Sequence, residues 1–332
     1  MQDLAVSIAV VCFNEEEDIK PCLDSLLIQQ IGDAYEIIIV DNNSTDSTAQ
    51  IIKEYASLYS CIRFFNNPDR KISKSRQISL REAKAKLLAF VDADCVVPFD
   101  WLGVLLKGYH KYSKIYPKLA AVGGGNIFPK KRNMFQKAAS IVLSSFWGSH
   151  TSTQGRLFKE DRLVRHIPTV NILYNREVLL GMGGFDEDFG NICEDVELNH
   201  RLSRAGYKFV FLKDSFVWHN FAPNLWIWIK RVFAYGKGRV WIIKKHPSHL
   251  QIKFLLPPLL IIFLIISFVT AGNSLLFRLP LIYFPLVLFI SVYESLRNKK
   301  LTQTPLVFLI YVLTHLCYGL GEFYGIFERH KV

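Results

Sequence analysis

Acidic residues are absent from a long stretch of this sequence, because residues 215–293 contain neither aspartate nor glutamate. The whole chain of 332 residues carries 40 lysines and arginines against 29 acidic residues, which gives a formal net charge of +11. Such an excess favours an anionic partner, either nucleic acid or the headgroups of an anionic membrane. The stretch also mixes its basic residues with aromatic ones, a composition that both partners accept.

Closely spaced cysteine pairs are also missing. The six cysteines are scattered along the chain, and no Cys-x-x-Cys pair occurs among them. We therefore expect no metal–thiolate site and predict a reduced, cytosol-facing compartment. We also expect no secretory signal peptide, since Asp3 lies near the N-terminus and the apolar run of residues 6–11 is too short for one.

Long apolar runs lie after residue 254. Residues 254–272, 275–293 and 305–327 are each about long enough to cross a bilayer as a helix, although the third can also re-enter or lie at the interface. Basic residues in the loop 294–304 and in the segment before residue 254 place both on the cytoplasmic side. These runs decide between the two anionic partners: we predict membrane lipids and no nucleic acid.

Short apolar segments and helical patterns alternate through the first part of the chain. Strand-like segments fall at residues 6–11, 35–40, 61–65 and 87–91, and helical patterns at residues 15–30, 48–59 and 73–86. This alternation predicts an α/β fold, with a mostly parallel sheet and helices on both of its faces. Ligands bind such sheets beside the carboxyl ends of the strands.

Polar clusters follow three of these strands, at residues 12–15, 41–46 and 92–94. They therefore converge on one edge of the predicted sheet, where we expect a binding site. Asp92 and Asp94 are one residue apart, and alternate residues of a strand share a face. Together they can hold a divalent cation through oxygen ligands. The alternative is a pair of ordinary turn aspartates.

Two other segments have two interpretations each. The glycine run at residues 123–125 indicates either close approach of backbones or a flexible turn. Residues 129–149 mix basic and large apolar side chains, so they predict either a core helix or an amphipathic helix on a membrane surface, which we favour.

Residues 6–220 resemble the family 2 glycosyltransferases, which have a GT-A fold. Four stretches carry the resemblance: the opening strand that ends in Asn14-Glu15, the turn Asp41-Asn42-Asn43-Ser44-Thr45-Asp46-Ser47-Thr48, the motif Asp92-Ala93-Asp94, and Gly183-Gly184-Phe185-Asp186-Glu187 followed by Glu194-Asp195. The chain departs from the family pattern at residues 11–13 and lacks the usual glycines at Lys71, Ser79 and Ala85.

The resemblance implies a role for each matching position. Asp195 would be the catalytic base. The donor nucleotide would contact Cys12, Asn14, Glu15, Asp41, Arg76 and Asp92. The metal ligands would be Asp94, Asp92 and His219. Residues assigned to the acceptor or to neighbouring groups are Glu194, Asn171, Gly184, Arg231 and Lys237.

The implied activity is transfer of a sugar from a nucleoside diphosphate sugar, with UDP favoured, to a lipid-linked or cell-surface polysaccharide acceptor. A single base without an enzyme nucleophile implies inversion, and the cofactor would be Mn²⁺ or Mg²⁺. The Gln-x-x-Arg-Trp motif of processive synthases is absent. Alternatives are a polyprenyl-phosphate glycosyltransferase, a processive synthase, or a membrane-tethered scaffold with a degenerate site.

The predicted organisation has three parts. Residues 1–222 form the GT-A catalytic domain, residues 223–253 a basic and aromatic interfacial segment, and residues 254–332 a membrane domain. The predicted location is the inner membrane, as a multi-pass protein with its catalytic domain in the cytoplasm.

Overall fold

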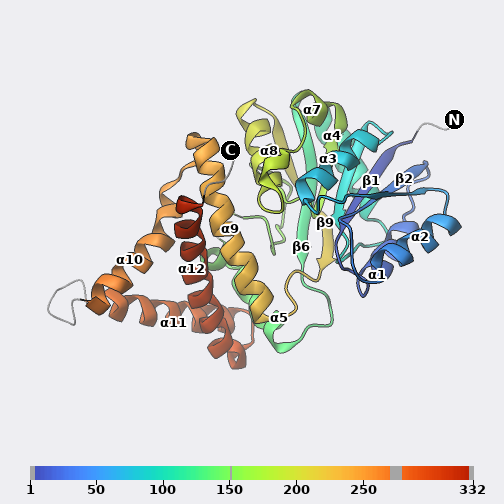
Figure 1. The fold of residues 1–332 in the computed structure, drawn as a ribbon. Helices are drawn as coiled ribbons and strands as arrows, with labels where there is room; N and C mark the ends of the chain where they lie inside the picture. The colour runs from blue at the N-terminus through green and yellow to red at the C-terminus, as the bar shows by residue number, and fades with distance from the viewer. Residues whose placement is uncertain (1–3, 150–151, 270–278, 329–332) are drawn as a thin grey trace. The chain divides into compact units, whose positions relative to one another are not determined.

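The structure, a computed structural model, describes residues 4–149, 152–269 and 279–328 (Figure 1). The chain divides into two compact units, one formed by Met1–Pro129 with Thr153–Phe221 and the other by Lys130–Ser152 with Ala222–Val332. The sequence predicts one continuous catalytic domain over residues 1–222. The division instead places residues 130–152 in the second unit.

A nine-stranded sheet forms the centre of the first unit. In spatial order its strands are β3 (Ile62–Asn66), β2 (Tyr35–Asp41), β1 (Val6–Cys12), β4 (Leu87–Asp92), β8 (Asn171–Asn175), β6 (Leu119–Ile127), β9 (Lys208–His219) and β5 (Cys95–Val96), with β7 (Arg162–Val164) paired to β9. β1 to β4 run parallel, β8 is antiparallel to both neighbours, and β6 is parallel to β9. The prediction of a mostly parallel α/β sheet is confirmed.

Alternate residues of the central strands point into two separate cores, as strand geometry requires. Ile8, Ile39 and Val91 pack on one face, under helices α1 (Ile19–Leu27), α2 (Thr48–Leu58) and α4 (Trp101–Ser113). Ala9 and Phe90 pack on the other face, under α3 (Ile72–Glu82), α7 (Arg176–Gly181) and α8 (Glu194–Arg204). Asp92 shares the second face with Phe90, so it points toward α3 and α8.

Strand β4 ends at Asp92 and does not continue through Asp94. Ala93 and Asp94 form a turn into the short strand β5, where Cys95 pairs with His219 of β9. The prediction that Asp92 and Asp94 share one face of a strand is wrong, because alternation holds only while the chain stays extended. The turn instead brings Asp94 close to His219.

The glycine run lies inside strand β6 and serves close packing. A Cβ atom on Gly124 would lie 1.9 Å from the carbonyl oxygen of Ser215, and one on Gly123 would lie 2.4 Å from that of Asn171. The first of the two interpretations, close approach of backbones, is therefore correct. Strand β9 runs to His219 through a register shift opposite these glycines.

Replacing Gly124 by alanine is expected to destabilise the chain by about 3 kcal/mol, because the new methyl group meets a backbone oxygen that cannot move aside. Thermal unfolding of the detergent-purified protein measures this as a lower Tm. Gly181→Ala is the matched control, since a Cβ on Gly181 meets nothing within 4 Å and the residue lies in helix α7. Equal melting temperatures for the two variants would contradict the expectation.

The second unit is helical in the residues that the structure describes. Its helices are α5 (Met134–Ser144), α6 (Phe146–Ser149), α9 (Leu225–Lys245), α10 (Leu256–Val269), α11 (Leu279–Arg297) and α12 (Thr304–Phe327). Helices α9 and α12 lie side by side (Figure 1) and approach closely at glycines, since a Cβ on Gly236 would lie 2.0 Å from the carbonyl oxygen of Tyr318. Close backbone approach of this kind is common between helices in membranes.

Helix α5 packs inside the second unit. It buries Ala138, Ile141 and Val142, and the Tyr311 hydroxyl of α12 donates a hydrogen bond of 2.7 Å to the Ser145 hydroxyl next to α5. Of the two predictions for residues 129–149, the core helix describes α5 better than the favoured surface helix.

Two stretches among the described residues are long and apolar enough to cross a membrane, Ile252–Val269 and Leu301–Phe327. They overlap the first and third of the predicted spans. The second predicted span, residues 275–293, begins outside the described residues, and α11 is not one of the two stretches. By length and composition alone, this is weak evidence for crossing, so the membrane domain stays a prediction.

Candidate active site

The parallel strands of the first unit all end at one edge of the sheet. β1 ends at Cys12, β2 at Asp41, β4 at Asp92 and β9 at His219. The register places Cys12 beside Asp41, and Val11 beside Asp92. The structure therefore brings the three predicted polar clusters together at the carboxyl edge, where open α/β sheets bind ligands.

The turn after β2 is fixed by side chains on both sides. Asn14 has φ 54°, a left-handed conformation that asparagine tolerates, and its Oδ1 accepts a hydrogen bond of 2.8 Å from the Thr45 N–H. The Asn14 N–H donates to the Ser44 hydroxyl over 2.9 Å. Asp41 is 2% exposed and accepts from the Ser44 N–H over 3.1 Å. The turn that resembles a nucleotide-binding turn is therefore held rigidly by hydrogen bonds.

Cys12 lies beneath this turn. Its Sγ is 3.7 Å from Asp41 Oδ1, and the side chain is buried. Burial raises the pKa of the Cys12 thiol well above its ordinary value, with the Asp41 charge as a second cause. Cys12 is therefore a neutral thiol that packs against Asp41. Because its side chain is buried, any contact with a nucleotide would come through its backbone.

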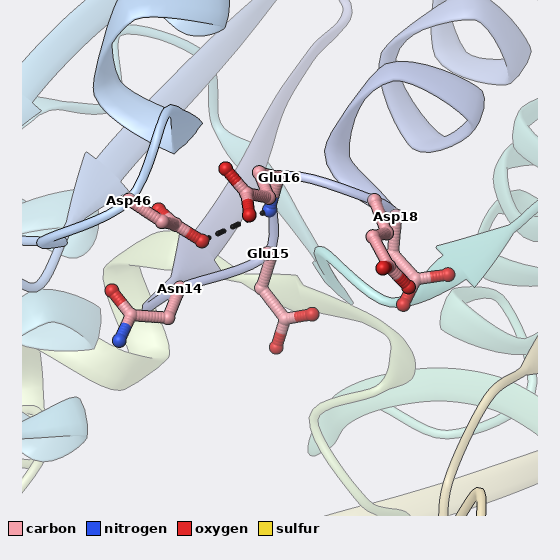
Figure 2. Close-up of a pocket in the computed structure, with 6 residues that line it drawn as sticks. Asn14, Glu15, Glu16, Asp18 and Asp46 are labelled. Carbon is pink, nitrogen blue, oxygen red and sulfur yellow. Dashed lines mark hydrogen bonds between the residues drawn. The ribbon is translucent and has the colours of Figure 1, made fainter.

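An acidic pocket adjoins Asn14. Its lining consists of Asn14, Glu15, Glu16, Glu17, Asp18 and Asp46. The Glu16 N–H donates to the Asp46 carboxylate over 3.3 Å (Figure 2), and the Glu15 N–H donates to the Thr48 hydroxyl over 2.8 Å. Burial raises the pKa of Asp18, which also accepts a hydrogen bond from Asn220. Five carboxyl groups repel an anion, so a diphosphate is not expected in this pocket without cations.

Arg76 joins three elements through ion pairs. From helix α3 it donates to Glu194 at the start of α8 and, over 3.2 Å, to Asp92 at the end of β4. Arg76 is 7% exposed and Glu194 is 4% exposed. The contact exists because Asp92 points to the sheet face that α3 and α8 cover. Glu194, which was assigned to the acceptor side, is thus a buried partner of Arg76.

Asp94 and His219 meet at the adjoining turn. Asp94 Oδ1 lies 3.1 Å from His219 Nε2. On the other side of the ring, Asn126 Nδ2 lies 3.1 Å from His219 Nδ1, while Asn126 Oδ1 accepts from the Gly155 N–H. Asn126 therefore donates to Nδ1, so a neutral His219 carries its hydrogen on Nε2 and directs it at Asp94.

The donor set here fits a divalent cation. Two neighbouring ligands on an octahedral ion with bonds of about 2.1 Å lie about 3 Å apart, which matches the separation of Asp94 Oδ1 and His219 Nε2. Cys95 Sγ belongs to the same group, within 4.8 Å, but burial raises the pKa of its thiol. Asp94 and His219 would hold the ion, with Nε2 free of its hydrogen in that state. Asp92, predicted as a second ligand, pairs with Arg76 through Oδ1, and its assignment to the metal stays a prediction.

Asp195 lies in the first turn of helix α8, after Cys193 in a left-handed conformation. Its Oδ1 accepts from the Val196 N–H over 2.8 Å, and its Oδ2 accepts from the Thr169 N–H over 3.3 Å. The side chain is 16% exposed, and His166 Nε2 lies 4.0 Å from Oδ2. A carboxylate held by two backbone donors and still open to solvent is suitable as a general base.

Asn171 has no surface left for a substrate. It is 0% exposed, its Oδ1 accepts from Trp101 Nε1 over 2.8 Å, and its Nδ2 donates to the Gly125 carbonyl over 2.9 Å. These bonds connect β8, α4 and β6 inside the first unit. The side chain of Asn171 is therefore not available for the predicted contact with an acceptor.

The remaining predicted residues are Gly184, in the loop before α8, and two residues of the second unit. Gly184 has φ 73°, and its carbonyl accepts from Arg201 over 2.6 Å, which anchors the loop before α8. Arg231 and Lys237 are on helix α9 of the second unit, where Lys237 pairs with Glu328 over 3.4 Å. Their assignment to the acceptor stays a prediction.

Two residues beside the site escaped the sequence analysis, Asn126 and His166. Asn126 directly follows the glycine run, and this position is the one feature of the sequence that could have indicated it. His166 lies in a loop without a motif, and only the fold brings it to Asp195.

A model of glycosyl transferase family 2 matches residues 7–181, which is more than half of the chain. Over 98% of both chains, the protein is 26% identical to the dolichyl N-acetyl-alpha-D-glucosaminyl phosphate 3-beta-D-2,3-diacetamido-2,3-dideoxy-beta-D-glucuronosyltransferase of Methanococcus voltae. It is also 26% identical to glycosyltransferase AglE of Haloferax volcanii, over 72% of this chain and 75% of that one.

Solved structures of similar fold include mannosyltransferase PcManGT of Pyrobaculum calidifontis in complex with GDP-Man and Mn²⁺. It has a TM-score of 0.61 and 17% identity, with 95% of this chain and 90% of that chain covered. GalNAc-T7 with UDP, GalNAc and Mn²⁺ has a TM-score of 0.51 and 17% identity, and this match covers 73% of the present chain and 48% of the other. The fold is therefore of the GT-A type, and the chain belongs to glycosyl transferase family 2 and is a glycosyltransferase.

Proposed function

We propose that this enzyme transfers a sugar, with inversion, from a nucleoside diphosphate sugar to a lipid-linked acceptor at the cytoplasmic face of a membrane. The observation that carries the proposal is the grouping of Asp41, Asp92, Asp94 and His219 at one edge of the sheet, with Arg76 joining Asp92 to the start of α8. At this edge, the rigid turn after Asp41 would bind a nucleotide, and Asp94 with His219 would bind a cation. The candidate base, Asp195, lies in helix α8, whose start is held by Arg76.

The chemistry follows from the groups present. A sugar hydroxyl is a poor nucleophile, so Asp195 would accept its proton as the oxygen attacks the anomeric carbon. The nucleoside diphosphate leaves from the opposite side, which inverts the configuration. A divalent ion at Asp94 and His219 would stabilise the negative charge on the leaving diphosphate. Arg76 holds Asp92 and Glu194 in place and thereby fixes the first turn of α8 next to Asp195.

Two observations support a lipid-linked acceptor. The Methanococcus voltae relative, similar over nearly the whole chain, is named for transfer to a dolichyl phosphate-linked sugar. The second unit also has two stretches long and apolar enough to cross a membrane and a helix α9 rich in basic and aromatic side chains. We infer that anionic lipid headgroups contact this helix and that the membrane part is multi-pass. UDP is the nucleotide that we expect.

The first test is the effect of nucleotides on thermal unfolding of the purified chain. UDP, GDP, CDP and dTDP are each added with and without Mn²⁺ or Mg²⁺. One nucleotide is expected to raise the Tm only when metal is present, since at about 100 times its Kd a ligand stabilises by about 2.7 kcal/mol. Asp94→Asn should abolish the metal-dependent part of this shift, because the variant lacks the anionic ligand.

Asp33→Asn is the matched control, because Asp33 is exposed and lies outside the site. It should keep the wild-type shift. No shift of the wild-type chain with any nucleotide would overturn the proposed donor site, and a full shift in Asp94→Asn would overturn the cation site.

A further inference from the structure

A buried chain of hydrogen bonds leads to His166 beside Asp195. The Tyr174 hydroxyl donates to Asn199 Oδ1 over 2.7 Å. Asn199 Nδ2 lies 2.9 Å from the Ile167 carbonyl and 2.9 Å from His166 Nδ1. Tyr174 and Asn199 are both 0% exposed. Burial raises the pKa of the Tyr174 phenol, and the Asp195 charge raises it further, so this donor keeps its hydrogen at every physiological pH.

These contacts determine which nitrogen of His166 carries the hydrogen. The Ile167 carbonyl can only accept, so the nitrogen of the Asn199 amide must face it. The same nitrogen faces His166 Nδ1, which therefore accepts. In the neutral ring the hydrogen is then on Nε2, the atom that lies 4.0 Å from Asp195 Oδ2.

The geometry of helix α8 explains why Asp195 and Asn199 both contact the loop before β8. Asp195 and Asn199 are four residues apart on α8, so they lie on one face, one turn from each other. The loop before β8 crosses this face and is held twice, by the Thr169 N–H on Asp195 and by the Asn199 amide on His166 and Ile167. Because Asn199 is fixed by Tyr174, the ring of His166 has little freedom to rotate.

We propose that His166 is a positioning residue for Asp195: it directs its Nε2–H at Oδ2 and thereby holds the carboxylate in the orientation that receives the proton of the acceptor hydroxyl. The separation of 4.0 Å is longer than a hydrogen bond. Hydrogen bonds of this kind are often long in a free enzyme and shorten when substrates are bound. The inference rests on the proposed role of Asp195.

The same geometry excludes a proton relay through the neutral ring. Nε2 already carries a hydrogen, and Nδ1 is occupied by the Asn199 amide, so His166 has no position from which to take a proton from Asp195. Its contribution is orientation and a dipole that favours the charged carboxylate.

Two substitutions test the two ring nitrogens of His166 separately. His166→Asn keeps an acceptor close to the position of Nδ1 and removes the donor toward Asp195. His166→Gln keeps a donor close to the position of Nε2 and removes the acceptor for Asn199. The readout is release of nucleoside diphosphate from a panel of UDP-, GDP-, CDP- and dTDP-sugars with a sugar linked to polyprenyl phosphate as acceptor, together with the Tm.

His166→Asn is expected to lower kcat by about 10- to 100-fold, a part of the usual contribution of a general base, with the KM for the donor changed less than about twofold. His166→Gln should retain kcat within about threefold and show the lower Tm of the two variants. Wild-type kcat in His166→Asn would overturn the inference. Equal loss of kcat in both variants would also overturn it, because the shape of the ring and not its donor would then matter.

Asp195→Asn, measured in the same assay, keeps the two proposals apart. An inactive Asp195→Asn with a fully active His166→Asn removes only the role of His166. A fully active Asp195→Asn removes the proposed base and the inference with it. In each variant, the nucleotide-dependent rise of the Tm confirms that the donor site is folded.

Discussion

Asp195→Asn is expected to lower the turnover of sugar transfer by about a thousand-fold, within the usual range for loss of a general base. The amide keeps the size of the carboxylate, and its one oxygen can accept from either the Val196 or the Thr169 N–H group, which bond to different oxygens of Asp195. It cannot take a proton from a hydroxyl. Because neither Asp41 nor Asp94 is altered, the rise in Tm on adding nucleotide with metal should equal that of the wild-type chain.

The matched control for Asp195→Asn is the variant Asp214→Asn. Asp214 is an exposed aspartate on β9 in the same unit, so its substitution changes the net charge equally without touching the site. Both variants are assayed at saturating donor, and the product is analysed for its anomeric configuration in the control. Turnover of Asp195→Asn within tenfold of Asp214→Asn would contradict the assignment of the base.

The sheet and its functional edge could be predicted because the information is local. Each central strand is a continuous apolar run, and a polar cluster follows it within the same ten residues, as at Asp41 and Asp92. Parallel strands then align those clusters at one edge without further information. The same reasoning places Cys12 and Asp41 at that edge, where the structure has them in register.

The pairing of the charged groups could not be predicted, because it depends on where one strand stops. Strand alternation was extended from the predicted strand at residues 87–91 to Asp94, yet the chain turns after Asp92. This turn places Asp92 beside Arg76 and Asp94 beside His219. Non-local partners are harder still. Asn126 and His219 are 93 residues apart, and His166 and Asn199 are 33 apart, so no pattern within a window connects them.

Arg76→Met is expected to have the largest effect on stability. It leaves the buried Glu194 carboxylate without its cation and leaves the Asp92 charge close by, and loss of one partner from a buried ion pair costs about 3–5 kcal/mol. For a unit of this size, that corresponds to a Tm lower by roughly 10 °C. The matched control is Arg81→Met, since Arg81 is exposed on the same helix α3.

The origin of this loss can be separated from lost packing by a second substitution. If the cost is the uncompensated charge of Glu194, then Arg76→Met combined with Glu194→Gln should recover a large part of the Tm, because a neutral amide is easier to bury than a carboxylate. The cycle of the two single variants and the double variant isolates that interaction. If the double variant melts as low as Arg76→Met or lower, the stabilisation comes from the packing of the arginine side chain. The start of α8, and with it Asp195, would then be positioned by shape and not by the ion pairs of Arg76.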